Sequence, residues 1–243
     1  LNKNYGTNDV TRTGINLVEN DNHVKVWLPG VGANYRFNNY VSLFGGVHKG
    51  FAPPTNTPGT DAENSTNYEI GTRYNYKKFS GELVVYFNDY KNLLGSDLAA
   101  SGGSGTLDQF NAGEAHVKGI EFLINYQVLK EESKFKLPIT FGYTLTDTEF
   151  VNEFASSDGA WGTIEKGDEI PYISKHQFNA SIALEHAKFE LILGARFNGE
   201  FRTVAGQGSI PNQFSVPNNT VVDFGSKYKF NKHFNLTGNI NNL

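Results

Sequence analysis

The sequence predicts an all-β protein, an antiparallel transmembrane β-barrel, and two patterns along the chain carry that prediction. Short connections lie at 38–39, 77–78, 130–134, 186–187 and 231–232, and they strictly alternate with long connections at about 50–65, 91–113, 148–175 and 200–219. Between the connections, apolar and polar residues alternate with the period of two that a β-strand imposes. Hairpins with tight turns at one end and long loops at the other are typical of outer-membrane barrels.

About ten segments carry this alternation, each close to the ~9–11 residues that a tilted strand needs to cross a bilayer. In chain order they are 31–37, 41–47, 68–76, 79–88, 118–126, 139–146, 177–184, 189–198, 222–228 and 234–240. One face of each segment is aliphatic or aromatic, and the other carries Asn, Ser, Thr, Gly, Glu and Arg.

The apolar faces can be written out segment by segment. The first five carry Val31, Ala33, Tyr35 and Phe37; Val41, Leu43 and Val47; Tyr68, Ile70, Tyr74 and Tyr76; Phe79, Leu83, Val85 and Phe87; and Ile120, Phe122, Ile124 and Tyr126. The other five carry Ile139, Phe141, Tyr143 and Leu145; Phe178, Ala180, Ile182 and Leu184; Phe189, Leu191, Leu193, Ala195 and Phe197; Val222, Phe224 and Tyr228; and Phe234, Leu236 and Ile240.

A soluble β-sandwich alternates in the same way, with its apolar face turned inward. Three features favour the membrane instead. The segments exceed the usual ~5–6 residues of globular strands. The short turns all fall on one edge. Aromatic residues recur near strand ends, where interfacial girdles would lie, at Tyr68, Tyr76, Phe79, Phe87, Tyr126, Phe189, Phe197 and Tyr228.

Composition excludes several classes of protein. The formal charge of −4 over 243 residues indicates no broad cationic surface for nucleic acid. The absence of cysteine removes disulfides, thiolate metal sites and cysteine nucleophiles. No apolar run approaches the ~18 residues of a transmembrane helix, which a barrel does not need.

Loop length predicts the orientation of the strands. Short turns belong on the periplasmic side and long loops outside. The stretch before Trp27 would then be external, and the strand that ends at Leu243 would run outward. Because the chain starts at Leu1 and stops inside a strand-like pattern, we expect residues 1–243 to be a partial barrel domain. A plug, the early strands and the last strand would lie outside it.

Five motifs then resemble TonB-dependent outer-membrane receptors, in order and at barrel spacing. They are Phe-Gly-Gly-Val-His-Lys-Gly-Phe-Ala-Pro-Pro at 44–54; a strand at 63–74 with a Tyr-Glu-x-Gly core; Val-Lys-Gly-Ile-Glu at 117–121; Ile-Pro-Tyr with Lys-His-Gln within 170–177; and Asn-Ile-Asn-Asn-Leu at 239–243. The resemblance covers about 27–243. Within the family, residues 110–113 and 200–208 look most like the ferric-citrate-receptor branch.

The resemblance implies a 22-stranded plugged barrel, the size of outer-membrane transporters, of which this chain would supply strands twelve to twenty-one. It implies import of an anionic ferric chelate across the bacterial outer membrane, driven by TonB through a segment outside this chain. Implied partners are the chelate, the plug, TonB, and outer-membrane lipid with lipopolysaccharide. A family receptor for glycans or cobalamin, a passive porin and a soluble β-rich adhesin stay open as alternatives.

An anionic chelate needs cations and hydrogen-bond donors, and arginine matches a carboxylate with a two-pronged fork. Arg202, beside Gln207 in a long external loop, is the first candidate for ligand contact. The alternative for Arg202 is a pair with lipopolysaccharide phosphate or with an acid of a neighbouring loop.

Four further candidates lie on strands. Arg196 and Arg73 are expected to face the lumen, where a salt bridge to acids of the plug or the barrel wall is the alternative. His48 and Lys49 lie where the wall opens outward, and His48 would otherwise be an ordinary wall histidine.

The sequence predicts no resident metal site, no cofactor and no catalysis. Its six histidines and its loop acids lack the spacing of a zinc-protease helix or a calcium loop. Its serines show no nucleophile elbow.

Overall fold

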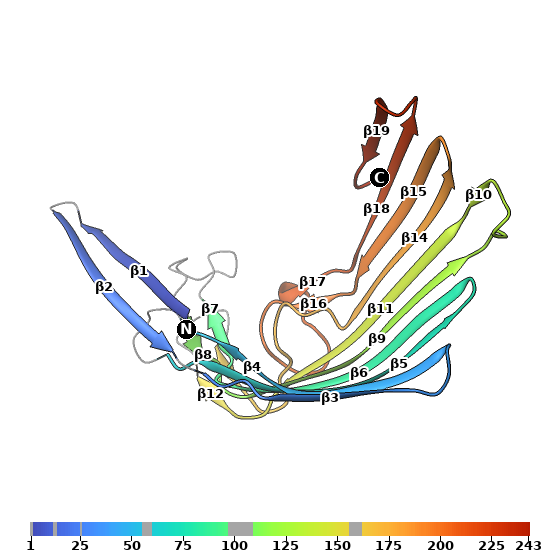
Figure 1. The fold of residues 1–243 in the computed structure, drawn as a ribbon. Coiled ribbons are helices and arrows are strands. Elements are labelled where there is room, and N and C mark those ends of the chain that lie inside the picture. The colour runs from blue at the N-terminus through green and yellow to red at the C-terminus, as the bar shows by residue number, and fades with distance from the viewer. Residues whose placement is uncertain (1, 12–13, 25, 55–59, 97–108, 156–161) are drawn as a thin grey trace.

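The structure is a computed structural model, and it describes residues 2–11, 14–24, 26–54, 60–96, 109–155 and 162–243. Ten long strands form one curved antiparallel sheet, each strand pairing with its neighbours in chain order (Figure 1). They are β3 (Gly30–Arg36), β4 (Val41–Ala52), β5 (Glu63–Tyr76), β6 (Phe79–Lys91), β9 (Ala115–Gln127), β11 (Pro138–Phe150), β14 (His176–His186), β15 (Phe189–Asn198), β18 (Asn219–Lys229) and β19 (Asn235–Ile240). This confirms the strands that periodicity predicts.

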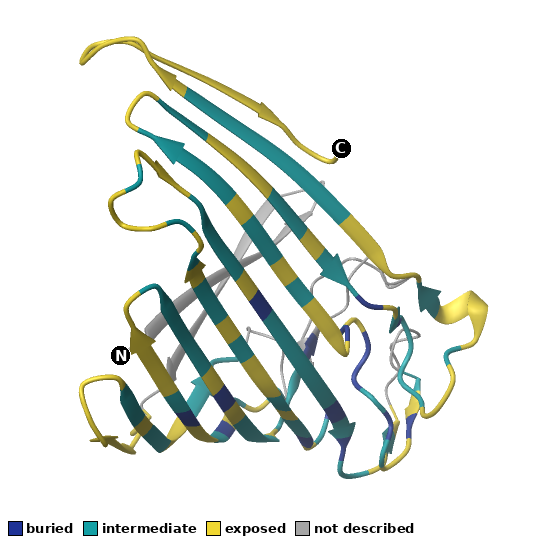
Figure 2. Cartoon of the chain, turned by 90° about the vertical axis from the view of Figure 1, so that its right-hand side faces the viewer, coloured by how far each residue is buried: buried dark blue, intermediate teal, exposed yellow. Residues whose placement is uncertain are grey.

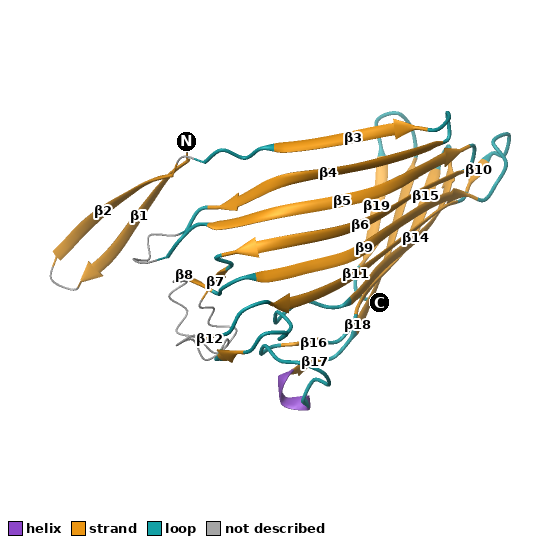
Figure 3. Ribbon diagram, turned by 90° about the horizontal axis from the view of Figure 1, so that it is seen from below, coloured by secondary structure: helices purple, strands orange, loops and turns teal. Residues whose placement is uncertain are grey.

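The two ends of the sheet differ as the sequence predicts, with tight turns at one end and long connections at the other (Figure 3). At the tight end, β10 (Phe135–Lys136) adds a short pairing to β14. The long connections hold small two-stranded ladders: β7 (Leu94–Ser96) with β8 (Gln109–Asn111), β12 (Phe154–Ala155) with β13 (Thr163–Ile164), and β16 (Phe201–Arg202) with β17 (Ser215–Val216). A 3-10 turn spans Asn212–Phe214. No helix in the described ranges is long and apolar enough to cross a membrane.

The strands run further toward the long connections than the sequence predicts. β4 reaches Ala52, β5 already begins at Glu63, and β11 continues to Phe150. The residues beyond the apolar stretch are polar or charged. The alternation of apolar and polar side chains is therefore absent there. The backbone ladder nevertheless continues, with His116 paired in register to Asp89 on one side and to Glu149 on the other. The predicted loop boundaries at 50–65 and 148–175 are therefore corrected by a few residues.

A further hairpin precedes the sheet and was missed by the sequence analysis. β1 (Asn2–Thr11) pairs with β2 (Gly14–Val24), and Figures 1 and 3 show the hairpin at the end of the long connections. The segment is rich in Asn, Asp and Thr and lacks an alternating apolar stripe. The signal that reveals the wall strands is therefore missing from it.

The two faces of the sheet have opposite surroundings. Many large apolar side chains are exposed on one face, for example Ile70, Val85 and Leu193. The long connections fold over the other face, on the concave side of the sheet (Figure 1), and cover its residues Val117 and Phe150. An exposed apolar array of this size needs a partner, and the partner that the sequence predicts is membrane lipid. We call the apolar face the outer face and the concave polar face the lumen face.

β3 and β19 are the edges of the described sheet. Unpaired backbone groups cannot persist in hydrocarbon. In a membrane, each of these two edges therefore needs a further strand as its hydrogen-bonding partner.

Candidate functional site

The three longest connections share one small hydrophobic core at the end of the sheet. Its buried members, which we call the loop core, are Ala112, Ala115, Phe150, Ile164 and Ile170. Ala205 from the connection between β15 and β18 packs against them. Figure 2 shows buried residues of the described part of the chain gathered at this end. The described parts of these loops are therefore packed together rather than independent.

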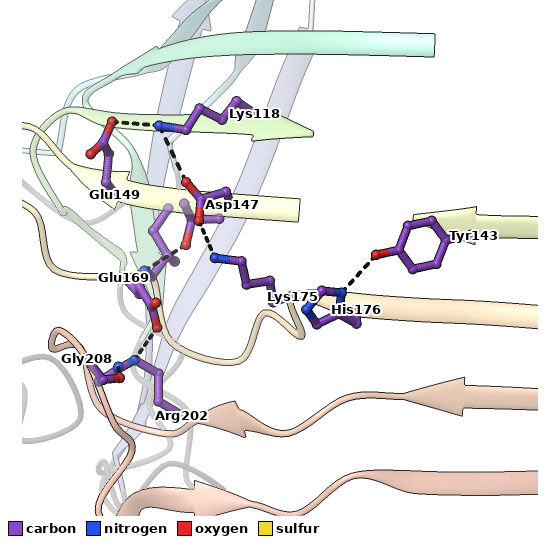
Figure 4. A network of polar contacts seen from close by, with 11 residues as sticks. Lys118, Tyr143, Asp147, Glu149, Glu169, Lys175, His176, Arg202 and Gly208 are labelled. Carbon is purple, nitrogen blue, oxygen red and sulfur yellow. Dashed lines mark hydrogen bonds and ion pairs between the residues drawn. The ribbon is translucent and has the colours of Figure 1, made fainter. Parts of the chain in front are cut away.

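Arg202 lies at the centre of the contact between two of these loops. Its side chain is 4% exposed. Its Nε donates to Glu169 Oε2 at 2.7 Å, and its Nη2 donates to the carbonyl of Gly208 at 3.0 Å (Figure 4). Backbone bonds flank the pair, from Glu169 N to the Gly206 carbonyl and from Tyr172 N to the Arg202 carbonyl. We call this arrangement the latch.

Gln207 strengthens the latch from the same loop. Its Nε2 donates to the Lys166 carbonyl at 3.1 Å and to Asp168 Oδ1 at 3.2 Å. Asp168 is itself buried, and its Oδ2 accepts from the backbone of Glu165. Arg202 and Gln207, which the sequence predicts side by side in one external loop, thus both contact the connection between β11 and β14. The pairing of Arg202 with a loop acid, its predicted alternative, is present, and direct contact of either side chain with a ligand stays a prediction.

Arg73 and Arg196 lie on the lumen face of the wall, each beside an acid of the next strand. Arg73 Nε donates to Glu82, and its guanidinium sits 4.0 Å from the centroid of the Phe44 ring. Arg196 Nη2 donates to Asp223 Oδ2 at 2.8 Å. The two arginine side chains are 50% and 65% exposed. A guanidinium has five N–H donors, so each keeps donors for a further acceptor.

The same two arginines belong to one cross-strand row of the sheet. The register runs Arg73, Glu82, Leu123, Gly142, Asn179 and Arg196. Side chains on such a row share one face. The row therefore places a guanidinium at each end of a largely uncharged stretch of wall.

His48 and Lys49 lie on opposite faces of β4. His48 is exposed and pairs in register with Asn67 on the lumen face. Lys49 follows the outer-face residue Val47 by two positions, and its Nζ donates to Thr66 on β5. Lys49 therefore lies on the outer face and His48 on the lumen face, and contact of either side chain with a ligand stays a prediction.

A second polar network, on the outer face, had no signal in the sequence analysis. Lys118 Nζ lies 3.4 Å from both Asp147 and Glu149, and Lys175 Nζ lies 2.9 Å from Asp147 (Figure 4). The hydrogen bond to Asp147 raises the pKa of Lys175 above its ordinary value. Across the register, His116 lies between the two acids Asp89 and Glu149, at 3.6 and 3.5 Å.

Tyr172 is a candidate ligand residue whose position in the sequence is marked only by the Ile-Pro-Tyr motif. Its φ is 63°, in the left-handed region, and its side chain is 47% exposed beside the ring of Phe201. A left-handed conformation is costly for a bulky residue, and such strain concentrates at ligand sites. The motif Ile-Pro-Tyr marked the position, but nothing in the sequence shows the strain.

The described residues include no group of three or more His, Asp or Glu side chains placed to hold a metal ion. The described residues instead offer groups that can bind a ligand. These are guanidinium groups, amides and an exposed aromatic ring around a polar concave wall.

Several solved structures are similar to this chain, and three of them are named as receptors or transporters for iron or a ferric chelate. The ferric-catecholate import receptor Fiu of E. coli matches with a TM-score of 0.66 at 17% identity, over 99% of this chain and 36% of that one. The ferric enterobactin receptor of Pseudomonas aeruginosa matches with a TM-score of 0.61 at 19% identity, over 92% of this chain and 35% of that one. The FrpB iron transporter of Neisseria meningitidis matches with a TM-score of 0.61 at 18% identity, over 92% of this chain and 35% of that one. The chain spans about a third of the length of these receptors.

Comparison with curated proteins finds no match. The sequence profile of the family described as TonB dependent receptor-like, beta-barrel, matches residues 2–243, which is nearly the whole chain. This protein therefore belongs to the TonB-dependent receptor β-barrel family, whose members are transport receptors of the bacterial outer membrane.

Proposed function

We propose that this chain forms wall and external loops of a receptor that imports an anionic ferric chelate across the outer membrane by TonB-coupled active transport. Family membership supports the coupling to TonB. The iron cargoes named for the similar receptors support the class of ligand. The alternatives are a family receptor for glycan or cobalamin and a passive porin.

The observation that carries the proposal is the pair of lumen-facing arginines. Arg73 and Arg196 each use one donor for a wall acid and remain half or more exposed. A carboxylate-bearing chelate such as ferric citrate accepts hydrogen bonds from such forks in bidentate fashion. Ferric citrate is the first candidate, with His48, Gln207 and Arg202 as further predicted contacts nearer the loops.

A ferric catecholate is the second candidate, and Tyr172 favours it. The ring is exposed at the loop end and held in a strained backbone conformation beside Phe201. Catecholate rings can stack on an aromatic side chain, in the offset or edge geometry that aromatic pairs prefer. Two of the similar receptors are named for ligands of this class.

In this proposal the external loops capture the chelate, and a plug in the lumen moves when TonB pulls on it. The loop core and the latch support a specific form of capture. Because the described parts of the loops share buried residues and the ion pair of the buried Arg202, they move as one unit rather than as separate lids.

Binding measurements on the protein purified from outer membranes test the proposal. We expect iron-labelled ferric citrate or a ferric catecholate to bind, and cobalamin and malto-oligosaccharides not to bind. Arg196→Gln is expected to weaken ferric-citrate affinity about tenfold, because a charge-assisted fork is worth about 1.5 kcal/mol or more. Lys188→Gln, at a short turn on the opposite end, is the matched control and leaves the affinity unchanged.

Binding of cobalamin or oligosaccharide without any ferric chelate would overturn the choice of ligand class. Chelate uptake that persists in cells without TonB would instead favour the passive porin.

A further inference from the structure

The short-turn end of the sheet carries a surplus of positive charge. The whole chain has 25 acidic and 21 basic residues, so its net charge is negative. The five short turns, taken with the three strand residues on either side of each, have the opposite balance. Their basic residues, which we call the cationic rim, are Arg36, Lys77, Lys78, Lys130, Lys134, Lys136, Lys188, Lys227, Lys229 and Lys232; their acids are Glu131, Glu132, Glu185 and Glu190.

The charges of the cationic rim have no partner in the part of the chain that the structure describes. The ion pairs found there lie on the wall or toward the long connections, as with Arg196 and Arg202. All rim residues except Lys78 and Lys227 are exposed. An ammonium group has three N–H donors, so the rim can donate to an external acceptor.

Lys77 shows that one of these charges stands where the turn itself favours another residue. Its φ is 51°, in the left-handed region. Hairpin turns need a positive φ, and glycine, asparagine and aspartate adopt it most readily. The Nζ of Lys77 lies 5.0 Å from the centroid of the Tyr76 ring. Turn geometry therefore gives no reason for a lysine at this position, whereas its charge does.

The short turns lie together at one end of the sheet, as Figure 3 shows, and in this family that end faces the periplasm. Neighbouring hairpins are two strand spacings apart, about 10 Å at ~4.8 Å each. The four hairpins from Lys77 to Lys232 therefore spread their lysines along an arc of about 29 Å. An anionic partner of this rim must be extended and must lie in the periplasm.

The composition of the turn tips bears on the class of partner. At 38–39, 77–78, 130–134, 187–188 and 231–233, every residue except Ala187 is polar or charged. A protein interface has an apolar centre with a polar rim around it, and these tips offer no such centre. A row of ammonium groups instead suits an extended polymer that bears carboxylates. The periplasm holds one in its peptidoglycan layer, whose stem peptides carry free carboxylates.

We propose that the cationic rim is a docking surface for peptidoglycan. The contact consists of ion pairs distributed over several turns, from lysine ammonium groups to stem-peptide carboxylates. It is separate from the lumen, and it depends on the orientation of the barrel rather than on the cargo.

Co-sedimentation of the detergent-purified, full-length protein with isolated peptidoglycan sacculi tests the proposal. We expect binding that weakens as salt is added and that is lost on sacculi whose carboxylates have been amidated. Lys130→Gln/Lys188→Gln/Lys232→Gln is expected to weaken binding roughly fivefold, because it removes three exposed ion pairs of modest strength. The corresponding Lys→Arg variant keeps the affinity.

Lys77→Asn gives a second readout that a structural role for this lysine would not produce. Asparagine tolerates a positive φ, so the urea midpoint of the variant is expected to equal or exceed that of the unchanged protein. Sacculus binding is nevertheless expected to fall roughly twofold, since one exposed ion pair is lost. Unchanged sacculus binding would contradict a role for the Lys77 charge.

Lys49→Gln/Lys91→Gln/Lys166→Gln, at the long-connection end, is the matched control with the same loss of charge, and it is expected to bind sacculi like the unchanged protein. Equal binding to amidated sacculi overturns the proposal, as does an unchanged affinity of the triple rim variant or an equal loss in the control. Phosphatidylglycerol vesicles are the last probe. If the rim variant loses vesicle binding and keeps sacculus binding, the lysines serve lipid headgroups and the proposal is wrong.

Discussion

Gly119→Ala is expected to destabilise the sheet by about 3 kcal/mol, at the upper end of the cost of overpacking. A Cβ at position 119 would overlap the carbonyl oxygen of Leu145 and lie 2.5 Å from the hydroxyl of Tyr86. The Tyr86 ring lies across the glycine, and its hydroxyl bonds to Thr146 on the far side at 3.1 Å. Since the Leu145 contact is with backbone, the strands themselves must separate.

Gly194→Ala is the matched control on the same face of β15. A Cβ there meets only the Ala180 carbonyl, at the ordinary contact distance of 3.9 Å. The measurement is the urea midpoint of the folded fraction in lipid vesicles for both variants. A Gly119→Ala midpoint equal to that of Gly194→Ala would show that Tyr86 does not close over Gly119.

Arg202→Ala is expected to open the latch, at a cost of about 2 kcal/mol for the lost charge-assisted bonds. Glu169 is 39% exposed, so water can replace part of the hydrogen bonding that its carboxylate loses. The Gly208 carbonyl loses its side-chain donor. The local consequence is faster backbone hydrogen exchange in 163–175 and 199–208, with the exchange of β5 and β6 unchanged. Arg73→Ala, which breaks an exposed wall pair, is the control and leaves loop exchange as it was.

The same variant separates two roles for Arg202. If Arg202 only holds the latch, the Arg202→Ala variant shows faster hydrogen exchange in the loops. Its chelate affinity then falls only because the loops lose their arrangement. If Arg202→Ala weakens chelate binding while loop exchange stays unchanged, the guanidinium contacts the ligand directly, as the sequence predicts. If neither changes, Arg202 has neither role.

The wall of this protein could be predicted from the sequence because its strands obey one local rule. Each residue of β5 or β15 faces either lipid or lumen, so hydrophobicity alternates along the chain. Strand ends were harder to place, since the residues from Asp147 to Phe150 are held by cross-strand partners rather than by lipid. The hairpin of β1 and β2 has no such alternation, and it was missed.

The site was predictable only in part, because its contacts join distant positions. Arg202 and Glu169 are 33 residues apart in different loops, and no local pattern pairs them. Lys118 and Asp147 face each other only once the register of β9 and β11 is known. Arg73 and Arg196 could be assigned to the lumen from period two alone, but their wall acids, Glu82 and Asp223, required the register.

Cysteine scanning along β6 tests most directly whether the apolar face of this sheet meets lipid and the polar face lines a lumen. The chain has no cysteine of its own, so a fluorophore can be placed singly at 84, 85, 86 and 87. The protein is reconstituted in vesicles whose acyl chains carry a nitroxide quencher. We expect strong quenching at Val85 and Phe87 and little at Val84 and Tyr86. Equal quenching at all four positions, or stronger quenching at Val84 and Tyr86, would contradict the assignment of the faces.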